Sequence, residues 1–417
     1  MSIKYIKNEL FIEGLSAKKI ADLYGTPTYV YSKKLILNNF NSYKKAFNKD
    51  IVCYAVKANS NQTLLEILAG LGAGADIVSG GELFKAMRAG INAQKIVYSG
   101  VGKTAEEIKY ALESNILMFN VESYEELCAI NKIARQMNKK ARISFRVNPN
   151  VDPDTHKYIT TGKHGTKFGI KYEDALDMYI SASKMANIEI VGIDTHIGSQ
   201  ILKIEPYKLA ALKISKLIDK LENLNIKIKY IDIGGGLGIK YEKNQKPPKP
   251  IELKKAVMSV FGKYKDKTLI VEPGRSIIGD TGIMLGKVIY RKKSGNKNFL
   301  IVDTGMNDLI RPTLYDAYHN ILPVKKTSKK QIVMDIVGPI CESGDFMAKD
   351  RKFPLLEQGD LIAVECIGAY GSAMASQYNS RKRSRGIIVD GKKVIHIRRR
   401  DEFEDLLRLE ENLEKYL

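Results

Sequence analysis

One pattern occurs eight times between residues 50 and 280: a short apolar run rich in β-branched residues, a turn, and a stretch with helical spacing. Helical spacing is clearest at Ala210, Ile214, Leu217, Ile218 and Leu221. Strands that alternate with helices pair in parallel, and eight such units close into a barrel. The pattern predicts an α/β fold with a TIM-like (β/α)8 barrel over residues 26–280. The eight runs are IVCYAVKA, GADIVS, KIVYSG, LMFNVES, ARISFRVNP, EIVGIDTHIG, IKYIDIGGG and TLIVEPGR.

The alternation of predicted strands and helices ends after residue 275. The apolar runs KVIYRKK, FLIVDT, QIVMDIVG, LIAVEC, GIIVD and KVIHIR are separated by turns such as KSGN and DGK, which is typical of antiparallel strands. We predict a mainly antiparallel β-domain from residues 1–25 and 281–417. The piece ELFIEG near the N-terminus is expected to pair with the C-terminal sheet, and DEFEDLLRLEENLEKYL is predicted to form a C-terminal helix.

Compartment and partners follow from composition. The N-terminus lacks the apolar core of a signal peptide, and no apolar run is long enough to span a bilayer. The four cysteines form no CxxC pair, so we expect free thiols, no metal site and a cytoplasmic protein. The formal charge of +20 raises the question of nucleic acid. No recognition motif accompanies basic runs such as RKRSR, so we expect a solvated basic surface, no nucleic-acid partner and no membrane.

Polar side chains end the predicted barrel strands, where catalysis takes place in this fold. Lys57 ends an apolar strand, and desolvation of such an amine would lower its pKa and allow a Schiff base with an aldehyde. A lysine that extends to solvent at the barrel rim is about equally consistent with the spacing. The glycines of DIGGGLG follow the seventh strand, where this fold often binds phosphate, although a tight turn explains them as well.

Three further strand ends allow a structural and a functional interpretation. His196 is either a satisfied core residue or a ring that stacks on a cofactor, with Ser199 near a phosphate. Glu272 either pairs with Arg275 or holds a proton on a pyridine nitrogen. Asp76 and Arg146 are supporting residues or a buried pair. In the β-domain, Cys341 beside Glu342 offers a proton donor and a carboxylate, although a free cysteine is more often a small core residue.

These motifs together resemble the fold-type III pyridoxal-phosphate decarboxylases, whose architecture is similar to that of alanine racemase. The resemblance covers nearly the whole chain. It implies a homodimer with active sites shared across the interface, and it is greatest to the branch that decarboxylates meso-2,6-diaminopimelate to L-lysine and CO2. Ornithine, arginine or carboxynorspermidine are the alternative substrates. The matching motifs are YGTPTYVYS, YAVKAN, GADIVSGGEL, FRVNP, TGKHGTKFGI, HIGSQI, DIGGGLGI, EPGRSI, MNDLIRPTLYDAYH, GPICESGD and GAYGSAMASQYN.

The resemblance also implies roles for individual residues. The expected catalytic residues are Lys57, which binds the cofactor covalently, His196, and Cys341, which donates a proton from the second subunit. The residues expected to bind pyridoxal 5'-phosphate are Lys57, Asp76, Arg146, His196, Ser199, Gly235, Gly236, Glu272, Gly274, Arg275 and Tyr370. The residues expected to bind substrate are Arg275, Arg311, Tyr315, Glu342 and Tyr370.

Substrate choice rests on charge. A second carboxylate needs cationic partners, and Arg275 and Arg311 can provide bidentate contacts that a substrate without that carboxylate does not need. Glu342 directly after Cys341 also fits the diaminopimelate branch better than the ornithine branch, where an aspartate follows the cysteine. The segment RKRSRG departs from the family pattern, but it contains no expected catalytic residue.

Overall fold

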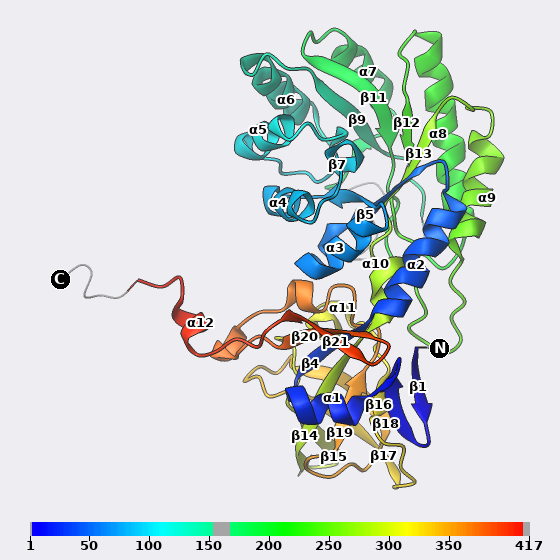
Figure 1. Ribbon diagram of the computed structural model, residues 1–417. Helices are drawn as coiled ribbons and strands as arrows, with labels where there is room; N and C mark the ends of the chain where they lie inside the picture. The colour runs from blue at the N-terminus through cyan, green and yellow to red at the C-terminus, as the bar shows by residue number, and fades with distance from the viewer. Residues whose placement is uncertain (1, 153–166, 412–417) are drawn as a thin grey trace. The chain divides into compact units, whose positions relative to one another are not determined.

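The computed structural model describes residues 2–152 and 167–411. They form two compact units (Figure 1). The barrel unit comprises residues 38–240 and 244–277, and the sheet unit comprises residues 1–37, 241–243 and 278–417. Part of the TGKHGTKFGI motif lies outside the described residues.

Eight parallel strands form the closed barrel, as the sequence predicts. Their order around the barrel is β9-β11-β12-β13-β5-β6-β7-β8, and β8 pairs again with β9. A two-residue strand, β10 (Ile170–Lys171), adds to β9 in parallel. The strands are β5 (Ile51–Ala55), β6 (Gly74–Ile77), β7 (Ile96–Tyr98), β8 (Met118–Val121), β9 (Ala141–Asn148), β11 (Ile188–Asp194), β12 (Tyr230–Asp232) and β13 (Thr268–Val271).

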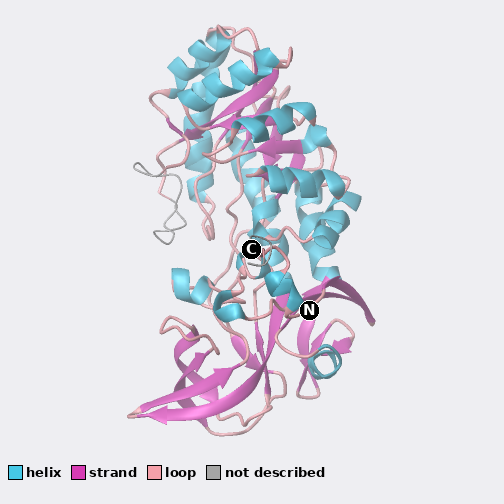
Figure 2. Ribbon diagram, turned by 90° about the vertical axis from the view of Figure 1, so that its left-hand side faces the viewer, coloured by secondary structure: helices cyan, strands magenta, loops and turns pink. Residues whose placement is uncertain are grey.

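Helices alternate with these strands and cover the outside of the barrel (Figure 2). Several begin at a polar side chain that accepts a hydrogen bond from the first turn: Asn61, Ser79, Thr104 and Ser123 are such caps. Each cap ends a strand-to-helix loop and so limits its length. The helices are α2 (Lys33–Ala46), α3 (Gln62–Gly70), α4 (Gly80–Arg88), α5 (Ala105–Glu113), α6 (Tyr124–Gln136), α7 (Ala175–Ser183), α8 (Glu205–Asn223), α9 (Pro250–Phe261) and α10 (Arg275–Ile278).

The sheet unit contains a large mixed sheet of order β18-β17-β15-β14-β4-β20-β21. In addition, β19 pairs with β14, and β16 pairs with β19. Most pairs are antiparallel, as predicted, but β15 with β17 and β4 with β20 are parallel. The strands are β4 (Thr28–Ser32), β14 (Gly282–Ser294), β15 (Lys297–Val302), β16 (Ile321–Pro323), β17 (Gln331–Val337), β18 (Phe346–Pro354), β19 (Leu361–Val364), β20 (Arg385–Asp390) and β21 (Lys393–Arg398).

The N-terminal segment differs from the expectation. The piece ELFIEG forms β2 (Glu9–Ile12), which lies in a separate sheet between β1 (Ile3–Ile6) and β3 (Leu15–Ser16), followed by α1 (Ala17–Tyr24). It is nevertheless joined to the C-terminal part of the chain. Glu9 forms a bridge to Lys325, Leu10 N–H donates to the Val324 carbonyl, and Gly391 N–H, between β20 and β21, donates to the Glu13 carboxylate. The strand that enters the mixed sheet is instead β4, which lies inside the range 26–280. Its five residues are buried and therefore fit a central strand.

The C-terminal helix is shorter than expected within the described residues. It is α12 (Glu404–Leu407), and residues 412–417 lie outside the described range. Figure 1 shows α12 standing away from the strands of the sheet unit. Across the part of the chain that the structure describes, no helix is long and apolar enough to cross a membrane.

Helix α8 offers a test of the predicted apolar stripe. Ile214 is fully buried on α8, so Ile214→Ala leaves a cavity and should lower the free energy of unfolding by about 2–4 kcal/mol. Leu209 on the same helix is 45% exposed, so Leu209→Ala should change it by less than about 0.5 kcal/mol. Urea unfolding followed by circular dichroism measures both; equal effects would contradict the assigned face.

Candidate active site

Lys57 and Asp76 form an ion pair at adjacent strand ends. Lys57 lies in a 3-10 turn (Val56–Ala58) directly after β5, and the parallel register places Asp76 of β6 beside Ala55. The Lys57 amine donates to Asp76 Oδ2, while Asp76 is fully buried. The Lys57 side chain is 39% exposed, so its amine is less desolvated than the sequence suggested. Asp76 thus holds the amine at the strand end.

Three more buried carboxyl groups gather at the ends of β11, β12 and β13. Asp194 lies beside Asp232 in the parallel register, and Glu272 follows β13. One ligand atom from each lies within 4.8 Å of the others. Burial raises the pKa of Asp232 to about 6, and burial together with the neighbouring acids raises the pKa values of Glu272 and Asp194 well above their ordinary values. The cluster therefore favours protonated carboxyl groups or a cation against them.

A hydrogen-bond chain orients Glu272. The Asn120 amide donates to Glu272 Oε1 at 3.4 Å and to Ser99 Oγ at 3.1 Å, and Ser144 Oγ donates to Asn120 Oδ1 at 2.5 Å. Oxygen atoms such as those of the cluster also suit a metal ion. Glu272 already accepts from Asn120, and Asp232 accepts from Gly234 N–H. The expectation that the chain has no metal site stays a prediction.

Arg146 and Asp76 each form an ion pair with another residue, whereas the sequence left open a buried pair between them. Arg146 Nη1 donates to Glu122 Oε1 at 3.1 Å, and Asp76 accepts from Lys57. Glu122 in turn accepts from the backbone N–H groups of Gly100 and Gly169, both at 2.8 Å. The guanidinium is therefore held in place at the end of β9 by a carboxylate that is itself fixed.

The glycine-rich loop after β12 contacts His196. Gly235 N–H donates to His196 Nδ1 at 3.1 Å, so Nδ1 carries no proton. Burial, helped by the charges of Arg146 and Lys57, lowers the His196 pKa well below its ordinary value, which keeps the ring neutral. A Cβ on Gly235 would lie 2.2 Å from the Glu272 carbonyl oxygen. Gly236, at φ +96°, would meet the Gly198 oxygen at 2.2 Å. These close approaches require glycine at both positions.

Ser199, Gly274 and Arg275 complete the set of predicted residues in the barrel unit. Arg275 Nη2 donates to Ser199 Oγ at 3.1 Å. A Cβ on Gly274 would lie 3.0 Å from the Ala58 side chain and 3.1 Å from that of Ala55. Gly274 therefore packs tightly against two alanines of the segment that contains Lys57. The barrel residues proposed from the sequence thus include an amine, a neutral imidazole, a buried acid and a glycine-rich loop, all at the ends of the barrel strands.

The remaining predicted residues lie in the sheet unit. Arg311 and Tyr315 begin and end α11 (Arg311–Tyr315), and Thr313 of this helix donates to the Gly344 carbonyl at 2.6 Å. The same loop carries Cys341 and Glu342, both exposed, and Asn379 Oδ1 accepts from Cys341 N–H at 2.7 Å. Tyr370, at φ +59°, belongs to the GAYGSAM segment.

Asp345 holds the loop that carries Cys341 and Glu342. Its carboxylate accepts from the backbone N–H groups of Met306 and Ile340, both at 2.7 Å. Gly338 packs against it, because a Cβ there would lie 2.5 Å from Asp345 Oδ2. The sequence motif GPICESGD is therefore explained by backbone geometry as well as by its reactive side chains.

The sequence reasoning missed Asp194, Asp232 and Asn120 of the site. It also missed Glu82 of α4, an acid whose pKa is influenced by burial, Lys57 and Asp76. The first two are acids at the end of otherwise apolar runs, in VGIDT and YIDIG, and this placement was the signal that could have found them. Asn120 in LMFNVES is the same kind of signal. Glu82 carried none, because an acid in the first turn of a helix is ordinary.

Comparisons with known proteins show which family this chain belongs to. The model described as "Pyridoxal-dependent decarboxylase, pyridoxal binding domain" matches residues 33–279. The chain belongs to the pyridoxal-dependent decarboxylases. It is 52% identical over 402 residues to the diaminopimelate decarboxylase of Aquifex aeolicus, covering 96% of each chain. It is 46% identical to that of Helicobacter pylori, covering 94% of this chain and 97% of the relative.

Solved structures match over nearly the whole chain. The H. pylori diaminopimelate decarboxylase complexed with L-lysine superposes with a TM-score of 0.91 at 45% identity, covering 96% of this chain and 100% of that one. The M. jannaschii enzyme with L-lysine gives 0.94 at 39% identity, covering 100% and 99%. A lysine decarboxylase from Selenomonas ruminantium gives 0.81 at 26% identity, covering 94% and 97%. The match to pyridoxal-dependent decarboxylases thus extends over both units.

The barrel residues fit a pyridoxal cofactor. A cationic ring nitrogen would offset the excess of buried acid around Glu272. Asp76 Oδ1, Asp194 Oδ1 and Asp232 Oδ2 are buried without hydrogen-bond partners among the described residues, as expected of a site built around a polar group.

Glu82 allows a pH test of this region. Burial raises its pKa to about 7 from an ordinary 4.5, against the opposing effects of Val78 N–H and Lys57. The folded protein thus binds this proton more tightly than the unfolded chain, so ionising Glu82 destabilises the fold as pH rises from about 4.5 to about 7. Glu82→Gln should remove that part of the pH dependence, measured by urea unfolding across this range. Glu106→Gln, at an exposed position of α5, is the control, and an unchanged profile in Glu82→Gln would contradict the prediction.

Proposed function

We propose that this chain decarboxylates meso-2,6-diaminopimelate to L-lysine and CO2, the last step of lysine biosynthesis, with pyridoxal 5'-phosphate as cofactor. The observation that carries the proposal is the joint presence of the Lys57–His196–Glu272 site and full-length similarity to diaminopimelate decarboxylases, some with L-lysine bound. The fold of the pyridoxal-binding barrel alone would leave the substrate open.

We assign the cofactor contacts by chemistry. The Lys57 amine would bind the aldehyde, and Glu272 would face the ring nitrogen. Ser199 and Arg275, beside the glycine loop, would hold the phosphate, while His196 would face the ring. The residues proposed for this role are Lys57, Asp76, Arg146, His196, Ser199, Gly235, Gly236, Glu272, Gly274, Arg275 and Tyr370.

The reaction divides between the cofactor and the chain. When bound, pyridoxal phosphate accepts the electron pair that remains on the α-carbon after CO2 leaves. Glu272 holds a proton at the ring nitrogen, which strengthens this electron withdrawal. Asp76 positions the Lys57 amine, and neutral His196 is fixed by Gly235 N–H. Cys341 then donates a proton to the carbon that lost the carboxylate.

A second carboxylate distinguishes the proposed substrate from ornithine and arginine. Arg311 is buried at 7% exposure, and a buried guanidinium favours an anionic ligand. Arg275, Tyr315, Glu342 and Tyr370 are the other residues proposed to bind the distal amino and carboxyl groups. The names of the relatives favour diaminopimelate over ornithine, arginine or carboxynorspermidine.

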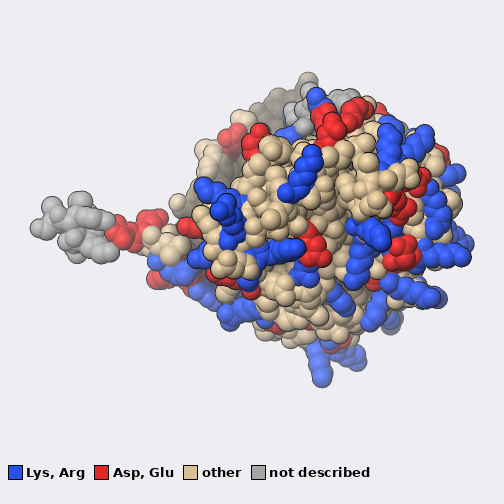
Figure 3. Space-filling view, turned by 90° about the horizontal axis from the view of Figure 1, so that it is seen from above, with Lys and Arg blue, Asp and Glu red and all other residues tan. Residues whose placement is uncertain are grey.

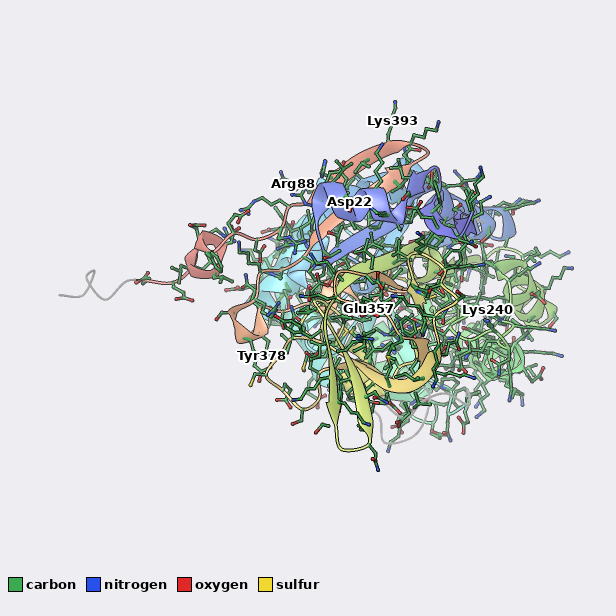
Figure 4. The ribbon with its side chains drawn as sticks, turned by 90° about the horizontal axis from the view of Figure 1, so that it is seen from below. Asp22, Arg88, Lys240, Glu357, Tyr378 and Lys393 are labelled. Carbon is green, nitrogen blue, oxygen red and sulfur yellow. The ribbon has the colours of Figure 1, made fainter. Side chains whose placement is uncertain are left out.

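We further propose a homodimer that shares its active sites and resides in the cytoplasm. Cys341 and Glu342 are exposed within one chain, so a second copy can receive them. Phe403, Leu407 and Leu409, next to and within α12, are 67%, 63% and 85% exposed, and a second copy would cover such an apolar segment. Tyr378, labelled in Figure 4, is another large side chain of the sheet unit that is exposed in the single chain, at 47%. The four free cysteines fit a reducing compartment.

The basic charge does not favour a nucleic-acid function. Figure 3 shows Lys and Arg side chains interspersed with Asp and Glu over the face in view. In Figure 4, Lys393 projects away from β21. Mixed charges of this kind are typical of a solvated surface.

Substrate choice is tested with purified holoenzyme and three substrates in parallel. meso-Diaminopimelate should be decarboxylated much faster than ornithine or arginine, measured by CO2 release. Borohydride reduction and peptide mapping should find the cofactor on Lys57, and Lys57→Ala should lose this adduct and the activity. Turnover of ornithine with none of diaminopimelate, or an adduct on another lysine, would contradict the proposal.

Shared active sites are tested by mixing two inactive variants. Lys57→Ala and Cys341→Ala should each lose most activity, because each removes a group from every site. After unfolding and refolding together, half of the dimers would be hybrids with one intact site, so about a quarter of wild-type activity should return. The control is each variant refolded alone. No recovery despite hybrid formation, checked by mass spectrometry, would show that Lys57 and Cys341 act within one chain.

A further inference from the structure

A buried trio in the sheet unit surrounds Arg311. Its members are Arg311 at the start of α11, His319 in the segment before β16, and Tyr241 in the short segment 241–243. Arg311 Nη1 lies 2.7 Å from His319 Nε2 and donates to Tyr241 Oη at 3.0 Å. The guanidinium carbon lies 5.1 Å from the centre of the Tyr241 ring. The Arg311 guanidinium thus has two acceptors, the Tyr241 hydroxyl oxygen and the His319 Nε2 atom.

The hydrogen bonds determine which nitrogen of His319 carries the proton. Nδ1 lies 2.8 Å from the Glu365 carbonyl oxygen, which can only accept, so Nδ1 carries the hydrogen. The guanidinium can only donate, so Nε2 must be the acceptor. Both contacts are satisfied together only by the neutral ring with its proton on Nδ1. His319 is fully buried, which fits a neutral ring.

Tyr241 fixes the plane of the guanidinium. Its ring meets the His319 ring edge-on, with centroids 5.4 Å apart and planes at 82°. Its hydroxyl and the His319 Nε2 atom both contact Nη1, so the two side chains together fix the rotation of Arg311 about its long axis. An arginine side chain otherwise loses considerable rotamer freedom when it is ordered by a ligand.

We propose that His319 and Tyr241 are positioning residues that orient Arg311 for the distal carboxylate of the substrate. The proposal rests on the proposed function, because it takes Arg311 as the ligand of that carboxylate. With Arg311 ordered by folding, less conformational entropy is lost on substrate binding, and the guanidinium is offered in one orientation. His319 and Tyr241 thereby favour a dicarboxylic substrate without touching it.

The chain provides a matched comparison. His396 on β21 lies 3.3 Å from Arg385 Nη1 through its Nδ1 atom, and its ring meets Tyr24 edge-on at 5.2 Å. Arg385 lies 5.7 Å from the Tyr24 ring centre. This second trio has the same residue types and similar contacts, but His396 is exposed. It separates the general effect of losing a histidine–arginine contact from an effect on Arg311.

The test compares two ligands that differ by one carboxylate. L-Lysine carries the distal carboxylate, and cadaverine (1,5-diaminopentane) lacks it. In His319→Leu, the inhibition constant of L-lysine and the KM for meso-diaminopimelate should each rise roughly tenfold or more, because a hydrogen bond to a charged group is lost. The inhibition constant of cadaverine and kcat should change little. His319→Gln places an amide oxygen near the Nε2 position and should restore most of the L-lysine affinity. Tyr241→Phe should raise the inhibition constant of L-lysine but not that of cadaverine.

Controls distinguish this proposal from the proposed function. His396→Leu should leave both inhibition constants unchanged, and Arg311→Ala gives the limit for complete loss of the carboxylate contact. Wild-type holoenzyme that does not decarboxylate meso-diaminopimelate would refute the proposed function itself. Suppose that the wild type is active and that Arg311→Ala loses affinity for L-lysine but not for cadaverine. The positioning role would then be overturned if His319→Leu changed neither inhibition constant, or raised both by the same factor. Should His319→Leu fail to fold, Tyr241→Phe decides by the same ratio of inhibition constants.

Discussion

The cluster of buried acids at the barrel strand ends is the constraint on which the site depends. Parallel register fixes Asp194 beside Asp232, and Glu272 follows the next strand. Carboxyl groups so close and so buried cannot all ionise without a compensating charge. The arrangement is therefore unfavourable for folding alone but suited to a ligand that brings a positive charge. Buried acids with strongly raised pKa values cluster at functional sites.

Asp232 connects the glycine loop with the cluster of buried acids. Its Oδ1 atom accepts from Gly234 N–H at the start of the glycine loop, and the residue also belongs to the acid cluster with Asp194 and Glu272. The next residue of the loop, Gly235, donates to His196 and packs against the Glu272 carbonyl. The glycine loop, the imidazole and the acid are therefore linked by hydrogen bonds and close packing.

The barrel and its strand-end residues could be predicted because each strand is a run of apolar β-branched residues that ends in a polar one. Lys57, His196 and Glu272 stood out for this reason. Asp194 and Asp232 did not, because a single acid within an apolar run looks like a weak strand rather than a site. The position of β4 could not be read from TYVYS, because a fully buried strand has no alternation and its partners are distant in sequence. Tyr241 lies in an irregular segment, and only the folded chain brings it to Arg311 and His319.

The position of β4 has a consequence for synthesis of the protein. This strand is made early but lies between β14 and β20, the second of which is encoded near the end of the chain. Its backbone groups therefore wait without their partners while the whole barrel is translated and emerges from the ribosome. The sheet unit has a high contact order and closes last, so a ribosome that stalls within the barrel releases a chain with an apolar strand that nothing pairs.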